Sequence, residues 1–279
     1  MKLHGLQKMT LLDFPGHVAC TVFLGECDFR CPFCHNYELA DGTAKPVMEE
    51  EEFFTFLEKR NGLLDGVAIT GGEPCLQKEL PAFLRKIKSR GFLTKLDTNG
   101  THPQLLRQIL EEGLADYVAM DIKNSPARYA ETAGLRIAES MAESGGYTRN
   151  DQGMQESDQA LTQETSDKAV VQETSDRAMD QKPAKEQEIL AAVRESVALL
   201  LQGKTAYEFR TTVVKEFHTA ADFEEIGRWI AGAQAYYLQC FTDRDSVPYG
   251  NLHAPSVEEL EEYRRIVSQY VSNVELRGV

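Results

Sequence analysis

The chain has no run of 18 apolar residues, and its first residues lack the long apolar segment and small-residue cleavage site of a secretory signal. We therefore expect neither a transmembrane helix nor a signal peptide. Basic residues are also scarce, since the chain has 30 lysines and arginines but 44 aspartates and glutamates, which gives a formal net charge of −14. That balance argues against unaided binding to nucleic acid or to an anionic membrane.

The six cysteines lack the paired spacing of disulfide-rich secreted domains. Three of them fall in one short segment, whereas Cys20, Cys75 and Cys240 stand alone. This usage fits a reducing environment, and we predict a cytoplasmic location. The length of 279 residues and the hydrophobic content of 42% allow a sizeable core, in one α/β domain or in two smaller ones.

The segment at residues 27–36 (CDFRCPFCHN) places Cys27, Cys31 and Cys34 at a C-x3-C-x2-C spacing. One loop of this kind can wrap a corner of a cubane [4Fe–4S] cluster, in which each of four irons needs a ligand. Three thiols leave one iron open, and the amine and carboxylate of an amino-acid group can chelate it. S-adenosylmethionine (SAM) carries such a group, and reductive cleavage of its sulfonium gives a 5′-deoxyadenosyl radical.

A structural zinc site made of Cys27, Cys31, Cys34 and His35 is the alternative. Zinc sites usually have two ligand pairs separated by about a dozen residues or more, and the sequence holds no second pair. The spacing therefore favours the cluster with an open iron. Phe33 offers a flat face beside Cys34, and with it the segment resembles the cluster motif of radical SAM enzymes, C-x3-C-x-aromatic-C.

Apolar, β-branched segments alternate with amphipathic helical patterns about six times along the chain. The expected strands are 17–24, 66–70, 92–97, 116–122, 207–214, 234–241 and 274–276, and the expected helices are 48–60, 79–90, 103–112, 189–202, 220–231 and 256–271. Continuous apolar strands separated by helices are typical of a parallel sheet covered by helices. Six units are too few for a closed eight-unit barrel, so we predict an open, partial parallel β/α barrel.

Residues 135–188 break this pattern and are predicted as an acidic insertion that divides the barrel domain into 1–134 and 189–279. Twelve Asp/Glu against six Lys/Arg leave this stretch a charge of −6. Related segments recur at 155–162, 163–171 and 172–180. A nine-residue period collects no apolar face in either a helix or a strand. We predict a disordered linker, with a weak helix as the alternative.

In sheets of this kind, ligands lie at the carboxyl ends of the strands. Several suggestive segments follow expected strands: 27–36, 70–74 (TGGEP), 97–100 (DTNG), 120–123 (MDIK) and 209–214 (FRTTVV). Each alone is compatible with an ordinary turn or strand end. Their common position at one rim predicts a single site. There, Gly71 and Gly72 allow a backbone to approach a ligand closely, and Glu73 can accept a hydrogen bond from an ammonium group.

Segment 70–74, placed after the cysteine segment, resembles the radical-enzyme motif that binds the methionine amino group of SAM. This resemblance implies cofactor contacts at Gly71, Gly72 and Glu73. Phe33, Cys34 and His35 match the positions at which that family contacts the adenine side of the cofactor through its backbone.

Segments 97–100 and 120–123 resemble those of glycyl-radical-enzyme activases. In that family, the two aspartates, the threonine and the methionine hold a monovalent cation near the cofactor carboxylate, and the lysine helps to place that carboxylate. The resemblance implies a cation site at Asp97, Thr98, Met120 and Asp121. It also implies cofactor contacts at Asp121, Ile122 and Lys123.

Arg210 is a charged residue in an otherwise apolar expected strand, and a buried arginine needs a partner. A salt bridge to a neighbouring acid would satisfy it. The resemblance implies instead that Arg210 contacts the cofactor carboxylate.

Residues 5–8 (GLQK) and 12–16 (LDFPG), followed by the cysteine segment, resemble the activating proteins of anaerobic ribonucleoside-triphosphate reductase. The resemblance covers nearly all of the chain except the insertion. It implies an activase that takes one electron from a flavodoxin or ferredoxin, cleaves SAM and abstracts a hydrogen atom from a backbone glycine of the partner reductase.

Alternatives to this function are an activase of the pyruvate formate-lyase type, a small-molecule radical SAM enzyme, and a non-catalytic iron–sulfur or zinc scaffold. A non-catalytic scaffold would leave the polar residues at the carboxyl ends of the strands without a role. Some activases have a cofactor-binding histidine after the sixth strand, where this chain reads QCFTD at 239–243, so no residue is assigned to that contact. We expect His218 and His253 to be surface residues.

Overall fold

The computed structural model describes residues 1–135 and 168–279, with side chains of the second part described from residue 184. The strands of its main sheet are β2 (Gly5–Thr10), β3 (Ala19–Leu24), β5 (Gly66–Gly71), β6 (Leu93–Thr98), β7 (Tyr117–Asp121), β8 (Ala206–Val213), β9 (Tyr236–Cys240) and β10 (Val274–Arg277). A separate antiparallel pair consists of β1 (Lys2–Leu3) and β4 (Met48–Glu49).

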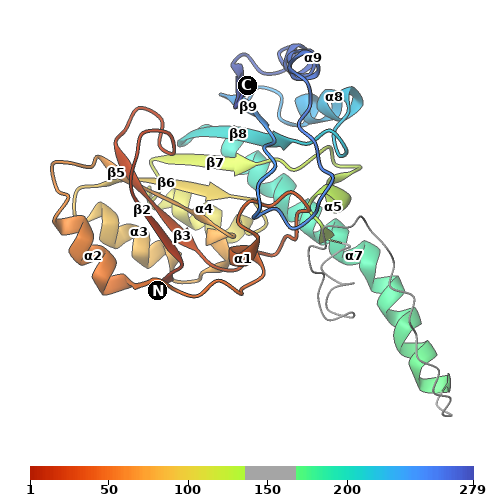
Figure 1. Cartoon of the computed structure of the whole chain (residues 1–279), viewed down its shortest axis with the longest axis horizontal. Coiled ribbons are helices and arrows are strands. Elements are labelled where there is room, and N and C mark those ends of the chain that lie inside the picture. Colours follow the sequence, from red (N-terminus) through yellow and green to blue (C-terminus); the bar gives the residue numbers. More distant parts are fainter. Residues whose placement is uncertain (136–167) are drawn as a thin grey trace.

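The main sheet has eight strands in the order β10-β9-β8-β7-β6-β5-β3-β2 (Figure 1). From β3 to β10 every neighbouring pair is parallel, and β2 is antiparallel to β3. Because β2 and β10 lie at opposite ends of this order, the sheet does not close. The predicted open, partial barrel is therefore confirmed.

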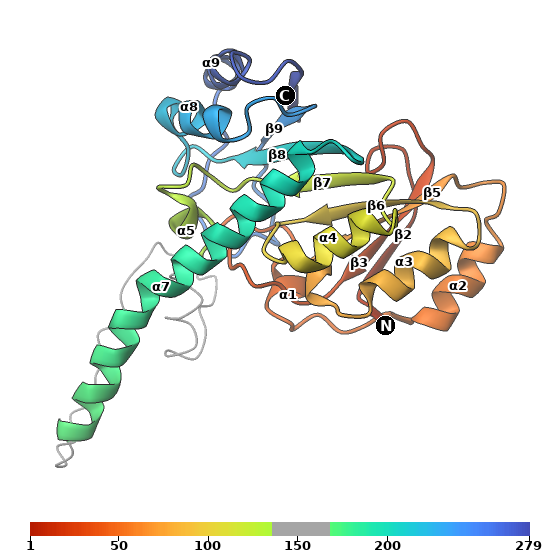
Figure 2. The same cartoon turned by 180° about the vertical axis from the view of Figure 1, so that it is seen from behind.

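The helices are α1 (Tyr37–Ala40), α2 (Glu50–Glu58), α3 (Leu80–Lys88), α4 (Pro103–Glu111), α5 (Tyr129–Thr132), α7 (Lys168–Leu201), α8 (Ala220–Trp229) and α9 (Val257–Val267), with a 3-10 turn at Pro74–Leu76. Figure 2 shows α2, α3 and α4 side by side on one face of the sheet. Parallel strands require such crossovers, since a short hairpin can join only antiparallel neighbours.

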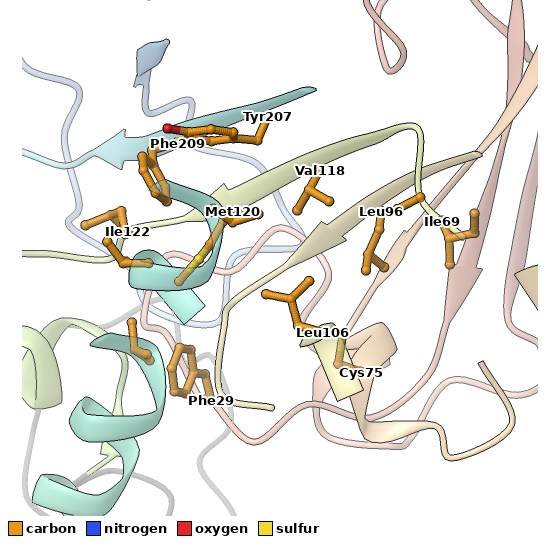
Figure 3. Close-up of a cluster of buried hydrophobic side chains, with 14 of the residues drawn as sticks. Phe29, Ile69, Cys75, Leu96, Leu106, Val118, Met120, Ile122, Tyr207 and Phe209 are labelled. Atoms are coloured by element: carbon orange, nitrogen blue, oxygen red, sulfur yellow. The ribbon is translucent and has the colours of Figure 1, made fainter. Parts of the chain in front are cut away.

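Helix α3 illustrates why these segments are helical. Leu80, Phe83, Leu84 and Ile87 recur at helical spacing and are buried, and Pro81 occupies the first turn, where its missing N–H is not needed. Ile69, Leu96, Val118 and Phe209 come from four neighbouring strands and are buried in the same hydrophobic cluster (Figure 3). This apolar layer holds the sheet to its helices.

The short elements β1, β4, α1 and α5 were not predicted, and two longer elements also differ from the prediction. Strand β2 was not expected, because its residues Gln7, Lys8 and Met9 are exposed and carry no apolar alternation. Helix α7 begins at Lys168 rather than at residue 189, so the expectation of an irregular linker is wrong for 168–188, where the alternative of a helix holds. Alanine, glutamate, glutamine and lysine favour helix, and a segment that continues an already packed helix needs no new nucleus.

Residues 136–167 lie outside the described part of the chain, and with them the first repeated segment and part of the second. The boundaries predicted for the insertion therefore stay predictions. No helix in the described part of the chain is long and apolar enough to cross a lipid bilayer.

Candidate functional site

A cavity of about 240 Å³ opens at the carboxyl ends of the parallel strands, where the rim segments were predicted to meet. The predicted site residues that line it are Cys27, Cys31, Phe33, Cys34, His35, Gly71, Gly72, Glu73, Asp97, Thr98, Asp121, Lys123 and Arg210. Thus segments separated by almost two hundred positions contribute side chains to one site.

Met120 and Ile122 are also predicted site residues but do not line this cavity. Their side chains are fully buried and point into the hydrophobic cluster of Figure 3. The backbone of Ile122 is engaged as well, since its N–H donates to the carbonyl of Arg210 and its carbonyl accepts from the hydroxyl of Thr211.

The cysteine loop leaves β3 and packs directly against the turn that follows β5. Gly71 has a φ of +125°, which a side chain rarely tolerates, and a Cβ on Gly72 would lie only 1.9 Å from the carbonyl oxygen of Glu26. The N–H of Glu73 also donates to the Glu26 carbonyl, over 2.7 Å. Glycine at both positions therefore lets the two loops touch through their backbones.

Of the three cysteines of the loop, Cys31 is buried and Cys27 and Cys34 are half-buried. Burial raises the pKa of Cys27 well above its usual range, and the carboxylates of Asp28 and Glu73 raise it further. Burial likewise raises the pKa of Cys31 to about 12 and raises that of Cys34. Because iron and zinc bind thiolates, a metal centre would release the thiol protons when it binds.

The zinc alternative is not formed by the described residues. His35 Nε2 lies 2.7 Å from the carbonyl oxygen of Thr242, and its ring stacks on Phe241. Within residues 1–135 and 184–279, no group of three His, Cys, Asp or Glu side chains is placed to share one metal ion. Three thiols on one cavity, without a fourth protein ligand, are the donor set that fits an iron–sulfur cluster with one open iron.

Glu73 is fully buried and joins the ends of β5 and β6. Its carboxylate accepts hydrogen bonds from the N–H of Cys75 (2.9 Å), the hydroxyl of Thr98 (2.8 Å) and the N–H of Asn99 (2.6 Å). Burial raises the pKa of Glu73 to about 7, with a further contribution from Asp28. A carboxylate has about four acceptor positions, so one remains for a ligand donor.

Five charged side chains form a second polar group on the cavity side of β6, β7 and β8. Arg210 contacts Asp121 and, over 3.0 Å, Asp97; Lys95 pairs with Asp97, and Lys123 lies 2.9 Å from Asp121. Burial alone would raise the pKa of Asp121, but Arg210 and Lys123 outweigh it and hold that pKa below its usual range. Lys123 and Arg210 are the two cations of this group that line the cavity, and a carboxylate ligand suits them.

The geometry confirms the salt-bridge interpretation of Arg210, and its contact with the cofactor carboxylate stays a prediction. Its guanidinium makes the predicted salt bridges to neighbouring acids, and it also lines the cavity. Asp97 and Asp121, two residues of the predicted cation site, are brought together by the same guanidinium. Thr98 instead donates its hydroxyl to Glu73.

Several cavity residues were not predicted from the sequence: Phe29, Asn36, Ala40, Thr70, Asn99, Thr212 and Gln239. Thr212 could have been found, because it lies two positions after Arg210 on one strand and so shares its face. Gln239 is the register partner of Thr212 on the next strand, and only the sheet topology brings it there.

His218 is buried, so the prediction of a surface position is wrong. Its Nε2 lies 2.9 Å from the carbonyl oxygen of Lys123, and its Nδ1 accepts a hydrogen bond from the N–H of Val214 over 3.1 Å. The ring thereby ties the segment that carries Lys123 to the end of β8. His253 is exposed, as predicted, and pairs with Glu216.

The burial of His218 predicts that the stability of the protein depends on pH. Burial lowers the pKa of His218, so the stability gained from the neutral ring is present above the unfolded value near 6.5 and is lost as the pH falls below it. We expect the free energy of unfolding, measured in urea, to fall by up to about 1.4 kcal/mol per pH unit in that range. His218→Gln should flatten this dependence. The exposed His253→Gln should keep it, and an equal slope in all three proteins would contradict the prediction.

Comparison with known proteins agrees with the chemistry of the cavity. Residues 21–147 match the model of the Radical SAM superfamily. This part of the chain is a radical SAM domain. It contains the cysteine loop, the Glu73 turn and the ends of β6 and β7, whereas Arg210 and Gln239 lie outside it.

Beyond the radical SAM domain, similarity extends along the whole chain. A Methanocaldococcus jannaschii protein, provisionally named as a glycyl-radical enzyme activating enzyme, is 27% identical over 278 residues, which cover 99% of this chain and 95% of that protein. The pyruvate formate-lyase-activating enzyme of Clostridium pasteurianum is 33% identical over 131 residues, 44% of this chain and 52% of that enzyme. The chain is thus homologous to glycyl-radical enzyme activating enzymes.

Solved structures support the fold around the radical SAM domain. SuiB of Streptococcus suis, in a crystal structure bound to S-adenosylmethionine, matches 92% of this chain with a TM-score of 0.58 at 10% identity. The match covers 52% of SuiB. At this identity the likeness concerns the fold.

Proposed function

We propose that this chain is a radical SAM activase that cleaves SAM reductively and installs a glycyl radical on a partner enzyme. The observation that carries the proposal is the convergence of three thiols, Glu73, Lys123 and Arg210 on one cavity. Similarity over 99% of the chain to a protein named as a glycyl-radical enzyme activating enzyme supports the reaction class.

In this proposal, Cys27, Cys31 and Cys34 hold a [4Fe–4S] cluster and leave one iron for SAM. When bound, the cluster supplies one electron to the sulfonium of SAM, and the 5′-deoxyadenosyl radical that results takes a hydrogen atom from a glycine of the partner. The chain binds and orients the reactants. Burial of Cys31 and of Glu73 limits the access of bulk water to this part of the cavity.

In this proposal, the negatively and positively charged side chains of the cavity contact different groups of SAM. Glu73 accepts from the ammonium group beside Gly71 and Gly72, and Lys123 and Arg210 take the carboxylate. Arg210 and Lys123 are already oriented by Asp121, so little side-chain entropy is lost on binding. Backbone groups of Phe33, Cys34 and His35 face the adenine, whereas the predicted contact of Ile122 has no support from the cavity lining.

The monovalent cation stays a prediction for Asp97, Thr98, Met120 and Asp121. Its test is a titration of SAM in potassium, sodium and tetramethylammonium salts. Equal affinity in all three would remove the cation from the proposal.

Anaerobic ribonucleoside-triphosphate reductase is the partner that we propose, on the basis of segments 5–8, 12–16 and 27–36. The 33% identity with a pyruvate formate-lyase-activating enzyme favours a second candidate, an activase of that type. Incubating the reconstituted, reduced protein and SAM with each partner enzyme separates them, because only the true substrate develops a glycyl-radical signal in electron paramagnetic resonance (EPR). Cleavage of SAM with neither partner modified would favour a small-molecule substrate.

A flavodoxin or ferredoxin is the proposed electron donor, and the reducing cytoplasm is the proposed location. The six cysteines are all free thiols in the structure, which agrees with a reducing compartment.

Glu73→Gln is expected to weaken SAM binding while the protein still binds about four irons. The glutamine side chain keeps the shape of the glutamate but has no charge. Its N–H₂ group must also lie among the N–H donors of Cys75 and Asn99. Loss of a charge-assisted hydrogen bond costs about 1.5–3 kcal/mol, which is roughly ten- to a hundredfold in Kd. Titration of SAM against the reconstituted protein measures it. Glu26→Gln, outside the cavity lining, is the control, and unchanged affinity in Glu73→Gln would remove Glu73 from the site.

A further inference from the structure

Asn99 connects the cysteine loop to the Glu73 turn. It follows β6, is only 5% exposed, and directs its side-chain N–H₂ toward the sulfur of Cys27 at 3.7 Å and toward Asp28 Oδ1 at 2.8 Å. Its backbone N–H donates to Glu73 over 2.6 Å.

The orientation of the Asn99 amide is determined by its neighbours. Asn99 Oδ1 accepts from the N–H of Thr101 (3.0 Å) and from its hydroxyl (2.7 Å). A flipped amide would turn its N–H₂ toward the Thr101 N–H and its oxygen toward the carboxylate of Asp28. The N–H₂ group is therefore the one that faces Cys27.

The sulfur of Cys27 has a second donor, the N–H of Phe29 at 3.4 Å. Hydrogen bonds to the sulfurs of an iron–sulfur cluster stabilise its more negative, reduced form and so raise its reduction potential. A thiolate is also a stronger acceptor than the thiol, so both contacts strengthen when Cys27 ligates a metal.

We propose that Asn99 is a positioning residue that, through its hydrogen bond to Cys27, makes the cluster easier to reduce. The inference rests on the proposed function, because it needs a cluster at Cys27. It assigns Asn99 no contact with the substrate. The donor acts through the ligand sulfur, and its amide is held in place by Thr101.

The test is an anaerobic redox titration of the reconstituted protein without SAM or partner, followed by the EPR signal of the reduced cluster. Asn99→Ala removes the donor, and the nearly isosteric Asn99→Asp replaces it with a carboxylate oxygen. At the potential that half-reduces the wild type, we expect the ratio of reduced to oxidised cluster to fall about tenfold, which corresponds to about 59 mV for one electron. Iron content should be unchanged, and the g values should shift.

Thr101→Val is the matched control, since it removes a hydroxyl from the same loop but keeps the backbone N–H of residue 101, which still orients the Asn99 amide toward Cys27. Its potential should stay close to that of the wild type. If iron-loaded Asn99→Ala and Asn99→Asp both keep the reduction potential of the wild type, the proposal is overturned. Loss of iron from both variants would also overturn it, because Asn99 would then serve only to hold the cysteine loop in place. A wild type that binds no iron would instead refute the proposed function itself.

Discussion

Replacing Cys27, Cys31 or Cys34 by alanine is expected to abolish SAM cleavage and to prevent assembly of an intact cluster. Each thiol would ligate one iron, and loss of one leaves two irons without protein ligands. No other cysteine lines the cavity to replace the lost ligand. Iron content after anaerobic reconstitution and production of 5′-deoxyadenosine with dithionite measure the two effects.

Cys20→Ala, Cys75→Ala and Cys240→Ala are the controls and should retain the cluster. Cys240 is the best matched of them, because it is only half-buried and its loss leaves no large void. Stoichiometric zinc without iron in the anaerobically purified wild type would refute the cluster and restore the zinc alternative.

Arg210→Met is expected to lower both the stability of the apoprotein and its affinity for SAM after reconstitution. The guanidinium separates Asp97 from Asp121, and removing one member of a buried ion network leaves charge uncompensated at a cost of about 3–5 kcal/mol. One of the two cations that line the cavity is lost as well. Urea denaturation at pH 7 measures the first effect, and SAM titration of the iron-loaded protein measures the second.

A double variant separates these two effects. Arg210→Met with Asp97→Asn removes one charge of each sign, so we expect it to recover a large part of the lost stability but none of the lost SAM affinity. If the double variant also binds SAM like the wild type, Arg210 only neutralises Asp97 and makes no contact with the cofactor carboxylate.

The cysteine spacing and the alternation of strands with helices could be interpreted from the sequence because both are local patterns. A C-x3-C-x2-C segment needs only one loop to present three thiols, and parallel strands place their carboxyl ends at one rim whatever their order. Glu73, Lys123 and Arg210 could thus be assigned to one site although more than a hundred residues separate Glu73 from Arg210.

The amino-acid sequence by itself predicted the cluster chemistry, and it determined the open α/β fold and most of the residues that line the rim. Only the tertiary structure decided what surrounds them: the donor from Asn99 to Cys27, the burial of His218 against Lys123, and the register that places Gln239 beside Thr212. These contacts join residues from different strands and loops. Their local sequences carry no signal for the contact, because a hydrogen bond between distant segments depends on how the sheet and its loops pack together.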